Sequence, residues 1–382
     1  MTVPAPAAPP RPRAPLRRAL QAAAAAALLG TTMAGCSLGY YTQAVAGETS
    51  LLAASRPVED WLADPATPAP LRERLALALR IRAFASARLG LPDNRSYRRY
   101  ADLQRSSAVW SVFAAPPLSL TLKTWCYPLL GCAGYRGYFD LEAARRQARE
   151  LAGAGWDTHV APVPAYSTLG LLPDPLLNTF IGWPEPELAR LVFHELAHQV
   201  VYVRDDTRFN ESFATAVERV GVERWVAERQ DPALGVEFAQ YRMRQDDLLR
   251  IVGAARRQLE ALYAEPAAPG DAASDPRLAR KEQILAQIPL RYAEVRDARW
   301  NGFHGYDAFF NQAWNNARIG ALATYNDQVP AFEALLAREG GDLPRFYAAV
   351  RALARLDAPA RSAALLALAP GPAPPAPAES PP

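Results

Sequence analysis

The chain has 382 residues, half of them hydrophobic, and a formal net charge of only +3. This composition is that of an ordinary globular protein. It argues against binding to nucleic acid, because part of the arginine excess lies at the N-terminus and no basic run is interleaved with aromatic residues.

The N-terminus has the pattern of a lipoprotein export signal. Arginines precede an apolar run at residues 19–30, and residues 33–36, Met-Ala-Gly-Cys, read as a lipobox. Because the run is too short to span a bilayer, we expect residues 1–35 to be removed and Cys36 to carry lipid. Ser37, in place of Asp, favours the outer membrane, with the protein in the cell envelope and facing the periplasm. The alternative is a plain cleaved signal with an unmodified cysteine.

The segment that follows alternates helices with short strands. Apolar residues at helical spacing predict a helix at 70–89, and Gly90 and Pro92 end it. Prolines divide residues 107–122 into short strands. A helix at 140–151 with Asp140 as its N-cap and a strand at 158–166 come next.

Cys126 and Cys132 are the cysteines that remain after Cys36. Their spacing is wider than that of a usual metal-binding pair, and no second His or Cys pair accompanies them. In an oxidising periplasm the pair most simply closes a small disulfide loop. Buried free thiols are the alternative.

The most informative segment is His194-Glu195-Leu196-Ala197-His198, on a predicted helix. Residues four apart lie on one helix face, so His194 and His198 can bind one ion at about 2.0 to 2.1 Å. Glu195 then lies beside the metal and can take a proton from an activated water molecule. This is the HExxH pattern of metallopeptidases. The alternative is a helix whose histidines merely occupy a polar face.

Glu211 is the predicted third ligand. Twelve residues separate it from the second histidine, enough to end one helix, turn, and begin another at about 209–228. A His, His, Glu set favours one zinc ion, Zn2+. Glu218, two turns further on, could orient a ligating imidazole. Glu211 could instead complement a helix dipole, and Glu218 could be a solvated helix charge.

The C-terminal part is predicted to be helical. Two long polar helices, at 233–264 and 277–299, should form a helical hairpin near 233–299. Further helices are expected at 314–322 and within 329–356. Residues 36–368 are thus expected to form one domain, followed by a Pro-rich disordered tail at 369–382.

The motifs carry a family resemblance. The HExxH motif, followed by Asn210-Glu211-x-Phe213-Ala214-x-x-x-Glu218, resembles the zinc site of gluzincin aminopeptidases. More of the chain resembles a smaller family of predicted bacterial lipoprotein aminopeptidases. The resemblance implies an α+β, predominantly helical, zincin-like fold with a small sheet next to the HExxH helix. The segments that carry it are Gly39–Ala44, Val109–Pro116, Trp125–Pro128, Gly131–Cys132, Tyr135–Phe139, Ala165–Gly170 and Asn315–Ala317.

Substrate-binding residues are less well marked. The Gly-x-Met-x-Asn motif of the large zinc aminopeptidases is missing upstream of the zinc helix. Residues 165–170 could pair with a peptide backbone or form a buried corner. Candidates to hold a substrate ammonium group, each of which could instead be a loop or cap residue, are Asp174, Glu185, Glu187, Asp205 and Asp206. Candidates to stabilise the oxyanion or contact substrate, each of which could instead be a core aromatic, are Tyr166, Tyr202, His304, Tyr306 and Tyr325.

These features predict a zinc-dependent peptidase, with aminopeptidase activity preferred. It would act on peptide substrates and attach to the membrane through lipid at Cys36. One alternative is a zinc endopeptidase, which needs no ammonium anchor. The other is a non-catalytic envelope lipoprotein that uses a zincin scaffold for binding. Glu195 argues against that alternative, because a purely structural site needs no general base. The sequence does not determine the oligomeric state.

Overall fold

The computed structural model describes most of the chain. The described residues are 40–127, 131–266 and 274–368. The predicted signal peptide at 1–35, the predicted lipidation site Cys36 and the predicted tail at 369–382 lie outside them.

The chain divides into two units, residues 1–50 and residues 51–382. The described part of the first unit, residues 40–50, is helical. Within the described ranges, no helix is both long enough and apolar enough to cross a membrane.

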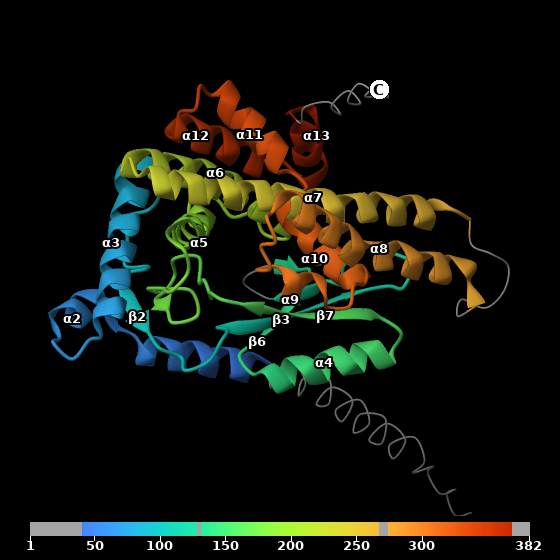
Figure 1. Cartoon of the computed structure of the whole chain (residues 1–382), viewed down its shortest axis with the longest axis horizontal. Helices are drawn as coiled ribbons and strands as arrows, with labels where there is room; N and C mark the ends of the chain where they lie inside the picture. Colours follow the sequence, from blue (N-terminus) through green and yellow to red (C-terminus); the bar gives the residue numbers. More distant parts are fainter. Residues whose placement is uncertain (1–39, 128–130, 267–273, 369–382) are drawn as a thin grey trace, which may run out of the picture. The chain divides into compact units, whose positions relative to one another are not determined.

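The second unit is predominantly helical and has small sheets (Figure 1). This content confirms the predicted α+β class. The helices are α2 (Val58–Ala63), α3 (Ala69–Leu89), α4 (Leu141–Gly153), α5 (Glu185–His198), α6 (Thr207–Arg229), α7 (Pro232–Ala264), α8 (Pro276–Arg299), α9 (Asp307–Phe310), α10 (Asn316–Asn326), α11 (Val329–Arg338), α12 (Leu343–Ala354) and α13 (Ala358–Leu368). The strands are β1 (Arg56–Pro57), β2 (Arg99–Ala101), β3 (Val109–Ala115), β4 (Trp125–Tyr127), β5 (Gly131–Ala133), β6 (Arg136–Tyr138), β7 (Asp157–Val163) and β8 (Leu176–Leu177).

The longest strands form an antiparallel sheet in the order β6-β3-β7, in which Val109 pairs with Val163 and Ala115 with Asp157. Helix α4 packs on one face of this sheet and α10 on the other (Figure 1). Asp140 is the N-cap of α4, as predicted, and its side chain accepts a hydrogen bond from Ala143 N at 2.7 Å. Two smaller sheets, β1-β2-β8 and β4-β5, complete the strands of the described residues.

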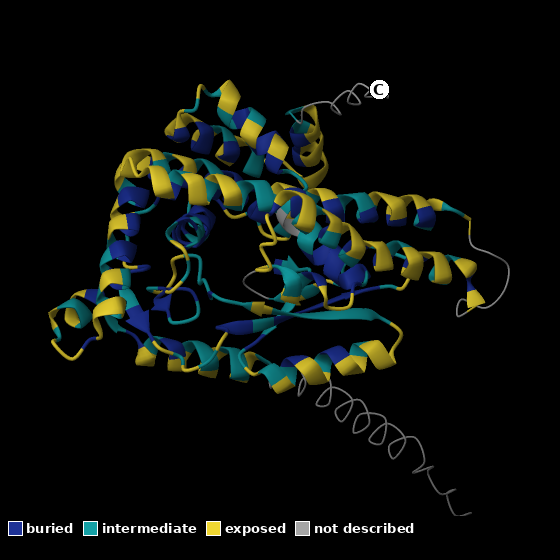
Figure 2. Ribbon diagram, in the orientation of Figure 1, coloured by how far each residue is buried: buried dark blue, intermediate teal, exposed yellow. Residues whose placement is uncertain are grey.

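Helix α5 lies in the core of the second unit, and Figure 2 shows it mostly buried. It packs against α3, α6 and α7. Gly221 lets α6 approach α5 closely, because a Cβ atom at this position would lie 2.8 Å from Cδ2 of Phe193 on α5. Helix α11 packs on α6 as well. The two helices that carry the predicted metal ligands are therefore held together by core packing.

The C-terminal part is helical, as predicted, although α9 and α13 were not predicted. Helices α7 and α8 pack against each other, as expected for a hairpin at 233–299 (Figure 1). The helical segment predicted at 329–356 is divided into α11 and α12. Gly340 and Gly341 both have positive φ, +70° and +74°, and this left-handed backbone ends α11.

Cys126 and Cys132 form a disulfide bond and pair across strands β4 and β5. The backbone N–H of Cys132 also donates a hydrogen bond to Asp205 Oδ1 at 2.5 Å. Asp205 lies in the connection between α5 and α6, so the disulfide-closed strands contact the segment that joins the two candidate ligand helices.

Candidate metal centre

Three side-chain atoms converge at the junction of α5 and α6. The Nε2 atoms of His194 and His198 lie 3.2 Å apart, and Glu211 Oε2 lies 3.1 Å from the first and 3.6 Å from the second. Donors that share a tetrahedral ion at about 2.0 to 2.1 Å lie about 3.3 Å from one another. The triangle therefore has the size of one face of a zinc coordination tetrahedron, and the group could hold a metal ion.

Local structure explains how the donors meet. His194 and His198 lie one turn apart at the end of α5. Asp206 caps α6 by accepting a hydrogen bond from Phe209 N at 3.0 Å. The helix therefore begins at Thr207, two residues before the predicted start at about 209, and Glu211 lies in its second turn.

Asn210 holds the connection between the two helices. It is 1 % exposed, its Oδ1 accepts from Val203 N, and its Nδ2 donates to Val203 O, both at 2.7 Å. These two hydrogen bonds join the loop to α6. The sequence motif included Asn210, but no role was predicted for it.

The candidate ligands are buried, with His194 and Glu211 8 % exposed and His198 7 % exposed. Burial alone disfavours a charged imidazole, but hydrogen bonds and charge from Glu211 and Glu218 raise the pKa of His194 above its ordinary value. Burial likewise disfavours the carboxylate of Glu211, yet the two histidines lower its pKa. The site therefore favours a positive charge at its centre, as a cation site should.

A second layer of charged groups supports His194. Its Nδ1 lies 2.9 Å from Glu218 Oε2, and Arg190 Nη1 donates to the same oxygen at 3.2 Å. A carboxylate on the second ring nitrogen orients a ligating imidazole and increases its basicity. Sequence reasoning missed Arg190, although it precedes His194 by the same four residues that separate His194 from His198. In contrast, His198 Nδ1 is buried without a hydrogen bond among the described residues.

One of the comparisons with known proteins finds a match. A family model described as "Putative aminopeptidase" matches residues 39–365. The chain belongs to this aminopeptidase family. The family's description points to a peptidase. No curated protein and no solved structure matches the chain significantly.

In this member of the aminopeptidase family, Glu195 directly follows His194 in the sequence and is only partly buried. It does not belong to the His194, His198 and Glu211 group. After burial, the charge of Glu195 contributes to the raised pKa of two buried groups, Tyr97 and Asp174. Glu195 is thus next to a candidate ligand in the sequence but is not one of the three clustered donors.

Three of the predicted ammonium-binding carboxylates have structural partners. Glu185 accepts hydrogen bonds from Trp225 Nε1 and Arg229 Nε, at 3.0 and 2.8 Å. Asp205 binds the Cys132 amide, and Asp206 caps α6 and pairs with Arg361. Glu187 is half-buried on α5, where burial raises its pKa although Arg190 opposes the rise.

Two of the predicted oxyanion residues lie in a cluster around α9. Tyr306 accepts a hydrogen bond from Gln245 at 2.7 Å, and the charge of Glu187 contributes to its raised pKa after burial. His304 is exposed and lies 2.8 Å from the carboxylate of Asp307.

The other aromatic candidates differ in their surroundings. Tyr166 follows β7 in a loop and packs on Phe139 with ring centroids 5.0 Å apart. Tyr202 is 42 % exposed, and its pKa is raised by burial and by the charge of the candidate ligand Glu211. The side chain of Tyr325 lies outside the described residues.

Asp174 is buried at 1 % exposure in a loop after β7. Its Oδ1 accepts hydrogen bonds from Thr168 N at 3.0 Å and Thr168 Oγ1 at 2.7 Å. Burial raises its pKa from the ordinary 3.8 to about 6, and the Thr168 bonds oppose the rise only in part. The folded protein therefore holds a proton here that the unfolded chain releases above about pH 4. This contribution to stability is complete below that pH and is lost as the pH rises through about 6.

Asp174→Asn should therefore gain stability relative to the wild type as the pH rises. Asn retains an oxygen that can accept the Thr168 bonds but carries no charge. Between pH 4 and pH 8 the difference in free energy of unfolding should shift towards the variant by about 2 to 3 kcal/mol, since one pKa unit corresponds to about 1.4 kcal/mol. Urea unfolding of both proteins at the two pH values measures this shift. An equal difference at both values would contradict the raised pKa.

Proposed function

We propose that the protein is a zinc-dependent aminopeptidase of the zincin type. The observation that supports this most directly is the triangle of His194, His198 and Glu211 donor atoms, with the carboxylate of Glu195 on the adjacent helix position. A His, His, Glu donor set suits zinc. A purely structural site would require the ligands but not the neighbouring base.

The roles of the residues follow from their places. A divalent ion held by the triangle would polarise a peptide carbonyl and lower the pKa of a water molecule. Glu195 accepts the proton of the attacking water and delivers it to the leaving amine. Glu218 accepts a hydrogen bond from His194 Nδ1 and keeps the other ring nitrogen turned towards the centre. Arg190 keeps Glu218 ionised, because its guanidinium lowers the pKa of that carboxyl against the effect of burial.

The family description favours removal of N-terminal residues over cleavage within a chain. A zinc endopeptidase is the second candidate, because an exopeptidase must bind the substrate ammonium group. Of the carboxylates considered for that role, Glu185, Asp205 and Asp206 already bind other groups, and Asp174 is buried.

Metal analysis and peptide digestion of the purified mature protein test the proposal together. We expect about one zinc ion per chain, release of N-terminal residues from free peptides, loss of activity with a chelator, and recovery when zinc is added back. The matched control is the same peptide with an acetylated N-terminus, which should resist cleavage. Equal cleavage of both peptides would reject the aminopeptidase and favour the endopeptidase. A zinc-loaded protein that cleaves neither would favour the non-catalytic binding protein.

We further propose that Cys36 is lipidated and anchors the protein to the periplasmic side of the outer membrane. The support is the lipobox of residues 33–36 with Ser37 after it. Cys36→Ser should move the protein from the membrane fraction to the soluble fraction of a cell lysate, since acyl chains rather than a membrane-spanning helix would hold it. Unchanged membrane association of the variant would contradict the proposal.

A further inference from the structure

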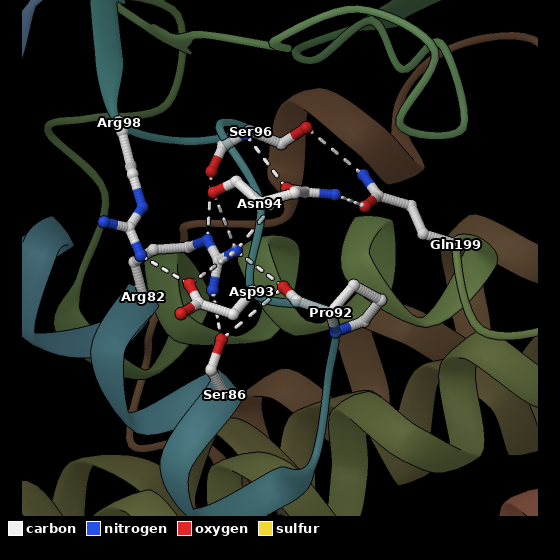
Figure 3. Close-up of polar contacts among 8 residues, drawn as sticks. All are labelled: Arg82, Ser86, Pro92, Asp93, Asn94, Ser96, Arg98 and Gln199. Atoms are coloured by element: carbon white, nitrogen blue, oxygen red, sulfur yellow. Dashed lines mark hydrogen bonds and ion pairs between the residues drawn. The ribbon is translucent and has the colours of Figure 1, made fainter.

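A buried arginine gives the loop of residues 92–98, which joins α3 to β2, a fixed shape (Figure 3). Arg82 of α3 is 1 % exposed. It donates hydrogen bonds to the carbonyl oxygens of Pro92 at 2.6 Å, Asn94 at 3.3 Å and Ser96 at 2.9 Å. Burying a guanidinium is costly unless its donors are satisfied. Here they are satisfied largely by backbone carbonyls of one loop, so the loop conformation is tightly constrained.

The 92–98 loop is also attached to the end of the metal helix. Asn94 Nδ2 donates to Gln199 Oε1 at 2.6 Å, and Gln199 Nε2 donates to Ser96 Oγ at 3.4 Å (Figure 3). Gln199 directly follows the candidate ligand His198. Gly170, from the loop after β7, packs on the same side chain, because a Cβ atom there would lie 3.0 Å from Gln199 Cδ. The 92–98 loop is thereby fixed relative to the candidate metal centre.

The residue that this arrangement holds is Tyr97. It is fully buried, and its φ of +63° lies in the left-handed region, which a bulky side chain rarely adopts. Its N–H donates to Asp174 O at 2.7 Å. Its hydroxyl is buried without a hydrogen bond among the described residues. Backbone strain and an unpaired buried hydroxyl both destabilise the fold, and such features cluster at functional sites.

Glu195, the general base of the proposed reaction, precedes Gln199 by four residues, so it lies on the face of α5 to which the 92–98 loop is attached. Burial, followed by the charges of Glu195 and Asp174, raises the pKa of Tyr97 well above its ordinary value. The phenol therefore remains protonated, and its hydroxyl can donate a hydrogen bond to an anion or to a water molecule. The Ser167 side chain is near it but does not meet the geometry of a hydrogen bond.

We propose that Tyr97 is a positioning residue for Glu195, to which its hydroxyl donates a hydrogen bond through one ordered water molecule. The bond turns the Glu195 carboxylate towards the metal centre. A water bridge fits a polar group that has no protein partner. The catalytic meaning of this arrangement rests on the proposed peptidase function.

Tyr97→Phe separates this role from a structural one. Tyr97→Phe removes a hydrogen bond to water and none to another protein group, so the melting temperature should change little. We expect unchanged zinc content, a kcat lower by about 10-fold with little change in KM, and about 10-fold weaker binding of acetohydroxamate. Acetohydroxamate chelates a divalent ion through two oxygens and gives its proton to a neighbouring carboxylate, so calorimetry with this probe reports on Glu195 even if no peptide is cleaved. Weaker binding without any peptide cleavage would support the inference and reject the proposed function.

Tyr347→Phe is the matched control. Tyr347 is also buried, but its hydroxyl donates to Leu89 O at 2.9 Å. This variant should lose thermal stability and retain acetohydroxamate affinity, the reverse of the Tyr97→Phe result. Gln199→Met, which releases the 92–98 loop and leaves Tyr97 intact, should weaken acetohydroxamate binding in the same direction and replaces Tyr97→Phe if that variant does not fold. Wild-type affinity in zinc-loaded Tyr97→Phe would overturn the inference, as would a zinc-loaded wild type that does not bind the probe.

Discussion

Glu195→Gln is expected to retain its zinc ion and to lose peptide hydrolysis by about 10² to 10⁴-fold, the usual contribution of a general acid and base. The amide has nearly the same shape as the carboxylate but cannot accept a proton. Glu195 lies outside the group formed by His194, His198 and Glu211, so the ligands are unchanged by the substitution. Steady-state kinetics on a free peptide, with metal content measured on the same sample, tests both parts.

Glu228→Gln is a suitable control for that experiment. Glu228 lies in the last turn of α6 and pairs with Arg88 on the surface, at 2.8 Å. The same chemical change there should leave turnover within experimental error, because an exposed ion pair contributes little. Normal turnover in a fully zinc-loaded Glu195→Gln protein would refute the role of Glu195. Loss of zinc from that variant would show instead that Glu195 is a ligand.

Glu218→Gln should weaken zinc binding by about 10 to 100-fold, the usual effect of removing a partner behind a metal ligand. The amide oxygen can still accept from His194 Nδ1, but the charge that increases the basicity of the imidazole is lost. Arg190 would also lose its ionised partner at 3.2 Å. Competition with a chromophoric zinc chelator at a fixed pH measures the change. Glu218→Ala, which removes the hydrogen bond as well, should have the larger effect.

Glu223→Gln provides the comparison on the same helix. Glu223 also pairs with an arginine, Arg242, but its side chain is 52 % exposed, whereas that of Glu218 is 9 % exposed. Solvent already screens the exposed pair, so its loss should leave zinc affinity unchanged. If Glu218→Gln binds zinc as tightly as the wild type, then Glu218 is only a buried helix charge and does not support the metal centre.

The sequence alone was sufficient for features that depend on neighbours a few residues away. The spacing of His194 and His198 places both on one helix face whatever surrounds the helix. Asp140 was predicted as an N-cap because capping involves only the next three residues, and Ala143 N is indeed its donor. The distance in sequence to Glu211 allowed a helix, a turn and a second helix, but it did not determine where that helix begins. Asp206 is the N-cap of this second helix, α6, which therefore begins closer to the N-terminus than predicted.

Tertiary structure alone decided which distant groups meet. Arg82, Asn94 and Tyr97 precede the HExxH motif by about a hundred residues, and no local pattern connects them to Gln199 or Glu195. Their approach depends on α3 packing against α5, and that packing depends on side-chain shapes throughout the core. Helical periodicity and capping act over one or two turns, so they can be read along the chain. Burial, strain and hydrogen bonds between separate segments exist only once the chain has folded.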